Sequence, residues 1–167
     1  MDKLELKTYP ESCLRTKTNP AENFKNNLQK TLKAMADVMY VNNGIGLAAT
    51  QVGIDASFIV VDAGEGLEPF VNPKVVGRSK RKIRMEEGCL SLPGIAVDVS
   101  RSEQITVKAQ DENGNTFIKD YAGLMARVIL HEVDHLNGKL IIDYLNPFRR
   151  FMAVRRLSAE KRKVKKC

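Results

Sequence analysis

Long apolar runs and paired cysteines are missing from this sequence of 167 residues. No apolar run approaches the roughly 20 residues of a membrane-spanning helix, and the first ten residues lack the apolar segment of a secretory signal peptide. We therefore expect a cytoplasmic protein that contacts no membrane. The three cysteines, at positions 13, 89 and 167, are widely spaced. This odd number argues against a disulfide framework and indicates a reducing compartment, where a thiol is free to bind a metal.

Excess positive charge is confined to the carboxyl-terminal end. The formal net charge is +7, but residues 149–167 contain nine Lys or Arg and one acidic residue, Glu160, while the rest of the chain is nearly balanced. DNA binding is therefore not expected. We expect one domain over residues 1–167, long enough to bury a core without disulfides. A basic helix and tail should occupy about residues 147–167.

Periodic apolar residues predict three helices. Asn19 and Pro20 are a good N-cap and first residue for a helix over about residues 20–40. Its apolar face recurs at spacings of three or four: Phe24, Leu28, Leu32, Met35 and Met39. A central helix is expected over about residues 123–136, and a last helix after residue 146.

Short alternating or β-branched runs predict strands. They cover residues 58–62, 70–76, 82–86, 104–110 and 115–121. The last two flank Asn113-Gly114, a pair typical of a hairpin turn with positive φ at both residues. Strands and helices are segregated along the chain and the strands are hairpin-linked, so we expect an α+β fold. In it, antiparallel or mixed sheets pack around the central helix, with an amino-terminal and a carboxyl-terminal helix outside.

Both histidines of the chain lie in the expected central helix, within L-H-E-V-D-H-L-N-G (residues 130–138). His131 and His135 are four positions apart, so their imidazoles share one helix face and can bind one metal ion. Glu132 follows the first histidine, as the general base does in H-E-x-x-H metallohydrolases. The alternative is an ordinary amphipathic helix whose histidines are one turn apart.

A third ligand is available in E-E-G-C-L-S-L-P (residues 86–93), where Cys89 lies in a turn-like setting next to glycine. One thiolate and two imidazoles leave a coordination position open for water, which is typical of catalytic zinc-type sites rather than structural ones. The alternative is a small buried cysteine, the commoner role of a single cysteine.

Three motifs together resemble those of a known family. G-I-G-L-A-A-T-Q (residues 44–51), E-G-C-L-S (residues 87–91) and H-E-V-D-H-L-N-G (residues 131–138) resemble, in order and spacing, the signature motifs of peptide deformylases. The resemblance implies hydrolysis of the formyl group from the formylmethionine end of a nascent polypeptide, releasing formate. It also implies one metal ion per chain on Cys89, His131 and His135. In bacterial members this ion is Fe²⁺, and Zn²⁺, Ni²⁺ or Co²⁺ can substitute.

The same resemblance implies roles for residues near the metal. Glu132 would take a proton from water as general base and deliver it to the leaving amine as general acid. Negative charge builds on the formyl oxygen, so that oxygen needs hydrogen-bond donors. The Gln51 side-chain amide and the Leu90 backbone N–H are the expected donors.

The expected substrate site lies beside these groups. The peptide would lie extended along Ile45, Gly46 and Gly88, pairing like an added strand. Its methionine side chain would enter an apolar pocket lined by Ile45, Leu124 and Val128. Ordinary core packing is an equally good explanation for each of these apolar residues taken singly.

Two positions depart from the family pattern. The family often has Gln before the first metal-binding histidine, where this chain has Leu130, so a hydrogen bond beside the metal is lost or replaced. Many members have Arg on the loop after E-G-C-L-S, where this chain has Ala96. Arg101 is expected to pair with Glu87 or Asp134 and hold the ligand loop against the helix.

The role of the basic tail and the function of the whole chain each have alternative interpretations. The tail is either a solvated helix end or, as the resemblance implies, a contact with ribosomal RNA that weakens with salt. A metallopeptidase sharing only H-E-x-x-H and a non-catalytic ribosome-associated protein are the other functions considered. Cys89 and Gln51 argue against the peptidase, and Glu132 argues against the non-catalytic protein.

Overall fold

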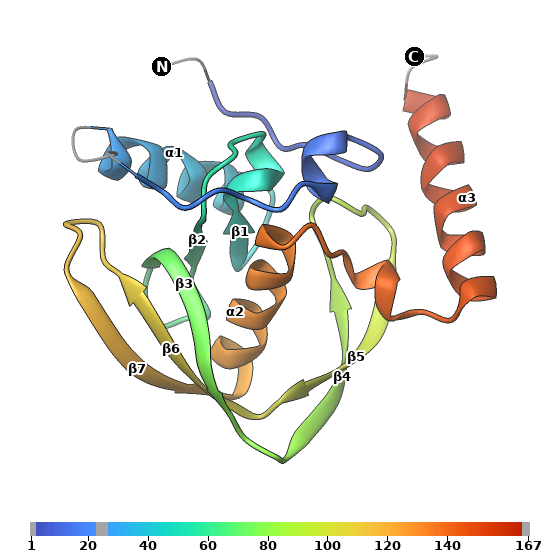
Figure 1. Ribbon diagram of the computed structural model, residues 1–167. Coiled ribbons are helices and arrows are strands. Elements are labelled where there is room, and N and C mark those ends of the chain that lie inside the picture. Colours follow the sequence, from blue (N-terminus) through green and yellow to red (C-terminus); the bar gives the residue numbers. More distant parts are fainter. Residues whose placement is uncertain (1–2, 23–26, 165–167) are drawn as a thin grey trace.

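Helix α2 (Gly123–Leu136) runs through the middle of the computed structural model, between two antiparallel sheets (Figure 1). The structure describes residues 3–22 and 27–164. The larger sheet has the order β1 (Gly46–Ala48), β2 (Phe58–Val61), β3 (Glu68–Arg78), β6 (Gln104–Gln110) and β7 (Thr116–Ala122). The smaller sheet is the hairpin of β4 (Lys82–Gly88) and β5 (Ala96–Ser102). The expected α+β fold around a central helix is confirmed.

The sequence of α2 explains its central place. Its buried apolar residues pack against the larger sheet, with Ala126, Ile129 and Leu130 each at most 2% exposed. The helix ends where the sequence indicated: Asn137 donates from Nδ2 to the Val133 carbonyl oxygen at 2.7 Å. Gly138 then takes φ +69°, and a Cβ there would lie 2.5 Å from a backbone oxygen of another segment. Only glycine fits this helix end.

The five strands that the sequence predicted lie close to their expected ranges, but one turn and two further strands differ. The β6–β7 hairpin closes through Asp111 and Asn115, and only Gly114 in its turn has positive φ, so a turn with positive φ at both Asn113 and Gly114 was wrong. A three-residue loop ending in a left-handed glycine satisfies the strand ends equally well. Strands β1 and β5 were not expected from the sequence, although β5 pairs along its full length with β4.

The first long helix, α1 (Leu28–Val41), begins later than expected. Residues 19–22 are not helical, and the N-cap is Asn27. Asn19 does not cap a helix because its backbone and side-chain amides donate to Asp55, at 3.1 and 2.8 Å. Leu28, Leu32, Met35 and Met39 are buried as the spacing predicted, and they cover β1 and β2. Phe24 lies outside the described residues.

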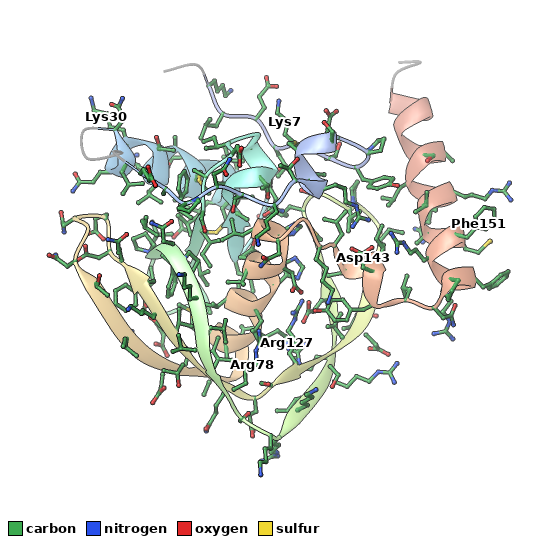
Figure 2. The ribbon with its side chains drawn as sticks, viewed as in Figure 1. Lys7, Lys30, Arg78, Arg127, Asp143 and Phe151 are labelled. Carbon is green, nitrogen blue, oxygen red and sulfur yellow. The ribbon has the colours of Figure 1, made fainter. Side chains whose placement is uncertain are left out.

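Helix α3 (Pro147–Val164) stands at one side of the molecule, beside the smaller sheet (Figure 1). Asn146 begins it, accepting from the Arg149 N–H at 2.9 Å. Leu157 is buried, but Phe148, Phe151 and Met152 are more than half exposed, and Phe151 lies on the outer side of the helix (Figure 2). The end of the basic tail, residues 165–167, lies outside the described residues. Within the described ranges no helix is long and apolar enough to cross a membrane.

The described part of the chain also contains three short 3₁₀ helices. They are η1 (Ser12–Arg15), η2 (Ala49–Val52) and η3 (Ile141–Tyr144). η2 continues directly from β1 and carries Gln51, whereas η3 follows α2 and precedes α3. The motif residues 44–51 therefore form a short strand and a 3₁₀ turn that lie against α2.

Candidate active site

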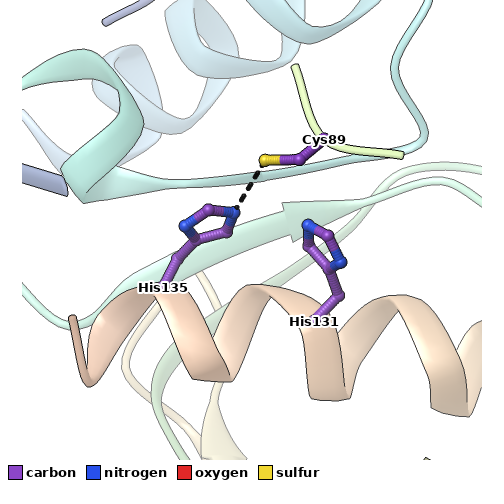
Figure 3. A group of neighbouring side chains, drawn as sticks. All are labelled: Cys89, His131 and His135. Atoms are coloured by element: carbon purple, nitrogen blue, oxygen red, sulfur yellow. Dashed lines mark hydrogen bonds between the residues drawn. The ribbon is translucent and has the colours of Figure 1, made fainter. Parts of the chain in front are cut away.

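Cys89, His131 and His135 converge between α2 and the end of β4 (Figure 3). Their ligand atoms all lie within 4.8 Å of one another, and Sγ of Cys89 is 3.2 Å from Nε2 of His135. The two imidazoles rise from neighbouring turns of α2, with ring centroids 5.0 Å apart. One thiolate and two imidazoles are a donor set that suits iron, zinc and similar divalent metals. The arrangement fits one such ion.

The backbone around Cys89 explains how its thiol reaches the helix. Strand β4 ends at Gly88, which pairs with Ala96. The chain then turns, and the Leu92 N–H donates to the Cys89 carbonyl oxygen at 3.0 Å. Cys89 is therefore the first residue beyond the strand, and its side chain extends toward α2 (Figure 3).

The carboxyl group of Glu132 lines the same cavity without a partner. The residue is 3% exposed, and Oε2 has no hydrogen-bond partner in the described part of the chain. Burial deprives the carboxylate of hydration and raises the pKa of Glu132 to about 7. Gly46 makes room for this group, because a Cβ at position 46 would lie 2.5 Å from Oε1 of Glu132. A buried carboxyl with a raised pKa at a cavity wall is suited to proton transfer.

The two histidines differ in their surroundings. Nδ1 of His131 lies 3.0 Å from Oε2 of Glu87. Burial alone would lower the pKa of His131, but hydrogen bonds with Cys89 and Glu87 outweigh it and raise that pKa to about 10. Burial instead lowers the pKa of His135 well below its usual value. Metal binding requires a neutral imidazole, so an ion held here would compete with a proton for His131.

Glu87 is the centre of a buried ion-pair network. Arg101 donates from Nε and Nη2 to the two Glu87 oxygens at 2.7 and 2.9 Å, and from Nη1 to Oδ2 of Asp134 at 2.9 Å. Arg101 thus contacts both acids between which the sequence left a choice. Arg127 donates to Glu87 as well, at 2.6 Å. Burial would raise the pKa of Glu87, but hydrogen bonds from His131 and Arg101 lower it to about 2.

Gln51 is buried with its amide in a fixed orientation. Its Oε1 accepts from the Ala48 N–H at 2.8 Å, so Nε2 is the end that faces the thiol. Nε2 lies 3.1 Å from Oγ of Ser91 and 3.8 Å from Sγ of Cys89. An amide held this way presents N–H groups beside the metal ligands.

A cavity of about 660 Å³ opens over these groups. Its walls include Glu132, His131, Cys89, Gln51 and Leu90 together with every residue expected to bind substrate: Ile45, Gly46, Gly88, Leu124 and Val128. Ile45 and Leu124 are about half exposed at its mouth, whereas Val128 is buried. The cavity is thus apolar where a methionine side chain was expected and polar at the ligands.

The sequence analysis did not assign several residues of this wall to the site, among them Met85 and Arg127. Met85 is half exposed on β4. The alternation of side chains along that strand was the only sequence feature that could have indicated its position. Arg127 precedes His131 by four residues, so helical spacing alone places it on the ligand face. Of the two positions that depart from the family pattern, Leu130 is buried in the core under α2, whereas Ala96 is exposed at the start of β5 and lines the cavity.

Comparison with known proteins decides the family, because residues 3–151 match the family model of polypeptide deformylase. The chain belongs to this family. The peptide deformylase of Thermotoga maritima is 40% identical over 161 residues, which cover 96% of this chain and 98% of the relative. The crystal structure of a peptide deformylase from Legionella pneumophila has 38% identity and a TM-score of 0.91 over 98% of each chain. That from Ehrlichia chaffeensis in complex with actinonin has 34% identity and a TM-score of 0.92 over 97% of this chain and 99% of that one.

Family membership gives the activity. The protein is a metal-dependent hydrolase that removes the N-terminal formyl group from formylmethionine on newly made polypeptides. This outcome favours the deformylase over the metallopeptidase and the non-catalytic protein. The convergence of two histidines and a cysteine agrees with a metalloenzyme of this kind.

Proposed function

We propose that Cys89, His131 and His135 hold one divalent ion and that the adjoining cavity binds the formylmethionine end of the substrate. The observation that supports this most directly is the convergence of three ligand atoms beside the buried, unpartnered carboxyl of Glu132. A bound ion would supply Lewis acidity, which makes water nucleophilic near neutral pH. We propose Fe²⁺ as the native ion, with Zn²⁺, Ni²⁺ or Co²⁺ able to replace it, because the ligand motifs resemble those of the bacterial enzymes.

Glu132 is the proposed proton carrier. Its carboxylate accepts a proton from the attacking water and then gives it to the nitrogen of the leaving methionine. A pKa of about 7 suits transfer in both directions near neutral pH. A neighbouring cation lowers this pKa, so the carboxylate would be ionised at the start of each turnover.

Gln51 and Leu90 are the proposed donors to the formyl oxygen. The Gln51 amide is already oriented by Ala48 and Ser91, so Nε2 need not reorganise when charge develops. Leu90 directly follows the ligand Cys89 and lines the cavity, which supports its backbone N–H as the second donor. Removing one such donor typically costs about 2.7–4 kcal/mol of barrier.

The substrate backbone is proposed to lie along Ile45, Gly46 and Gly88. No Cβ blocks the approach at the two glycines, and Gly88 has open space where a side chain would be. The methionine side chain would contact Leu124 and Val128, whose apolar surfaces face the cavity on the helix that carries His131. This pose brings the formyl carbon toward the metal ligands.

The cellular setting is also proposed. Since the substrate is a chain emerging from the ribosome, we infer that residues 1–167 work as one catalytic domain in the cytoplasm. The family match ends at residue 151, inside α3, so most of the basic helix extends beyond it. We propose ribosomal RNA as the partner of this helix. Ribosome binding that is unchanged by deleting residues 161–167, or by raised salt, would contradict this.

The activity is tested by formate release from formyl-Met-Ala-Ser, using protein purified without oxygen and assayed for metal. Glu132→Ala should retain the metal and lose at least about 10²-fold in kcat, since a positioned base contributes that much. Glu112→Ala, an exposed acid on the β6–β7 turn, is the control and should behave as wild type. A fully active Glu132→Ala variant would exclude the proposed proton carrier. An iron form that survives air as long as a nickel form would contradict the oxidisable thiolate–iron site.

A further inference from the structure

Arg127 lies between the two elements that carry the metal ligands, and the mechanism above gives it no part. It projects from α2, one turn before His131 (Figure 2). We propose that Arg127 is a positioning residue that fixes the geometry and affinity of the metal site by locking Glu87 and the β4–β5 hairpin onto α2. This inference rests on the proposed metal site and names a further residue on which that site depends.

The contacts of Arg127 reach both strands of the hairpin. Nη1 donates to Oε1 of Glu87 at 2.6 Å and to the Val99 carbonyl oxygen at 3.0 Å, and Nη2 donates to the Ile83 carbonyl oxygen at 2.6 Å. The side chain is 8% exposed. A planar guanidinium can serve three acceptors in fixed directions, whereas an ammonium cannot reproduce that fork. Arg127 therefore holds β4, β5 and the carboxylate at once.

Glu87 converts this attachment into control of a ligand. Each Glu87 oxygen accepts two hydrogen bonds: Oε1 from Arg127 and Arg101, and Oε2 from Arg101 and Nδ1 of His131. A carboxylate held by two guanidinium groups is an acceptor only, so Nδ1 of His131 must be the donor. The lone pair for a cation is then on Nε2. Such partners of metal-binding histidines typically affect metal affinity by about 10–100-fold.

Arg127 and Arg101 are not interchangeable in this arrangement. Arg101 belongs to the hairpin and reaches α2 at Asp134, three residues after His131. Arg127 belongs to α2 and reaches the hairpin four residues before His131. The two bridges thus flank His131 on both sides, and Cys89 follows Glu87 by two residues, directly after the end of the clamped strand. Loss of one bridge leaves the hairpin free to tilt, which changes the separation of thiol and imidazoles.

The test is the affinity for Co²⁺, measured on the full chain by competition with a chelator and by the thiolate-to-cobalt absorption band. Arg127→Met should weaken Co²⁺ binding by about 10-fold or more and shift the band. Arg127→Lys, which keeps the charge, should recover only part of the affinity. Arg84→Met is the control, because Arg84 lies on β4 but is exposed and pairs with Asp98; its affinity should equal that of wild type.

A double-mutant cycle with Glu87→Gln separates positioning from folding. If Arg127 acts through Glu87, Arg127→Met should have a much smaller effect on Co²⁺ affinity in the Glu87→Gln background. Wild-type affinity in Arg127→Met, or equal effects in both backgrounds, would overturn the inference. If Arg127→Met fails to fold, the test uses Arg127→Lys instead. Wild-type Co²⁺ affinity in that variant would then contradict the inference. Wild-type protein that binds no Co²⁺ would instead overturn the metal site itself.

Discussion

Replacing Gly46 by alanine should disable the enzyme without removing its metal. A Cβ at this position would lie 2.5 Å from Oε1 of Glu132 and 2.6 Å from Cγ1 of Val128. Ordinary carbon contacts begin near 3.5 Å, so one partner must move by about 1 Å. Glu132 is buried on a packed helix and has little room to move in any direction but the cavity. A misplacement of this size can cost about 10²-fold in rate.

The assay is kcat for formate release, with metal content measured on the same sample. Gly46→Ala should lose about 10²-fold in kcat while keeping its metal, because Cys89, His131 and His135 are not displaced. Gly77→Ala is the matched control: its Cβ would be as crowded, 2.7 Å from Oγ1 of Thr106, but this contact is between β3 and β6 and neither residue lines the cavity. It should lose stability and keep its kcat. Wild-type turnover by Gly46→Ala would refute the placement of Glu132 as proton carrier.

Three further predictions follow from single contacts. Leu130→Gln should lower the free energy of unfolding by about 1–3 kcal/mol in urea, because the amide enters the core beneath α2; unchanged stability would mean that it finds a partner. Gln51→Leu should lower kcat by about 10²–10³-fold with little change in metal content, and a small loss would assign the oxyanion to other donors. Burial would raise the pKa of Asp143, but hydrogen bonds led by that from Arg15 lower it below its ordinary 3.8. Asp143→Asn should therefore cost about 1–2 kcal/mol at pH 7. That difference should shrink as the pH falls below about 4, and a pH-independent difference would contradict the ion pair.

The parts of the fold that follow from local rules could be predicted from the sequence. The limits of α2 were predicted because its apolar spacing and its Asn137-Gly138 cap act within one turn. The predicted start of α1 was wrong because Asn19 donates a hydrogen bond to Asp55. This partner lies 36 residues away, and no local pattern reveals it. The place of Asn19 in the sequence does not show whether its side chain caps a helix or contacts Asp55.

Charged residues in buried places explain most of what the sequence did not show. Strand β5 alternates buried and exposed residues as a strand should, but one of its inward positions is Arg101. A guanidinium there breaks the apolar pattern on which strand prediction depends. Arg127 is hidden in the same way on the buried face of α2. Both side chains are explained only once Glu87 lies between them, which requires the complete fold.

The buried network also indicates which property of the enzyme it serves. Glu87 and Asp134 carry two negative charges, and Arg101 and Arg127 carry two positive ones. The free energy needed to remove these charges from water offsets most of their mutual attraction. A buried network of this kind therefore contributes little net stability. Its contacts nevertheless fix one imidazole and join the strand before Cys89 to the helix of both histidines. Directional hydrogen bonds specify position more strictly than apolar packing does, and a metal site depends on position. The network is therefore expected to matter more for metal affinity than for the free energy of unfolding.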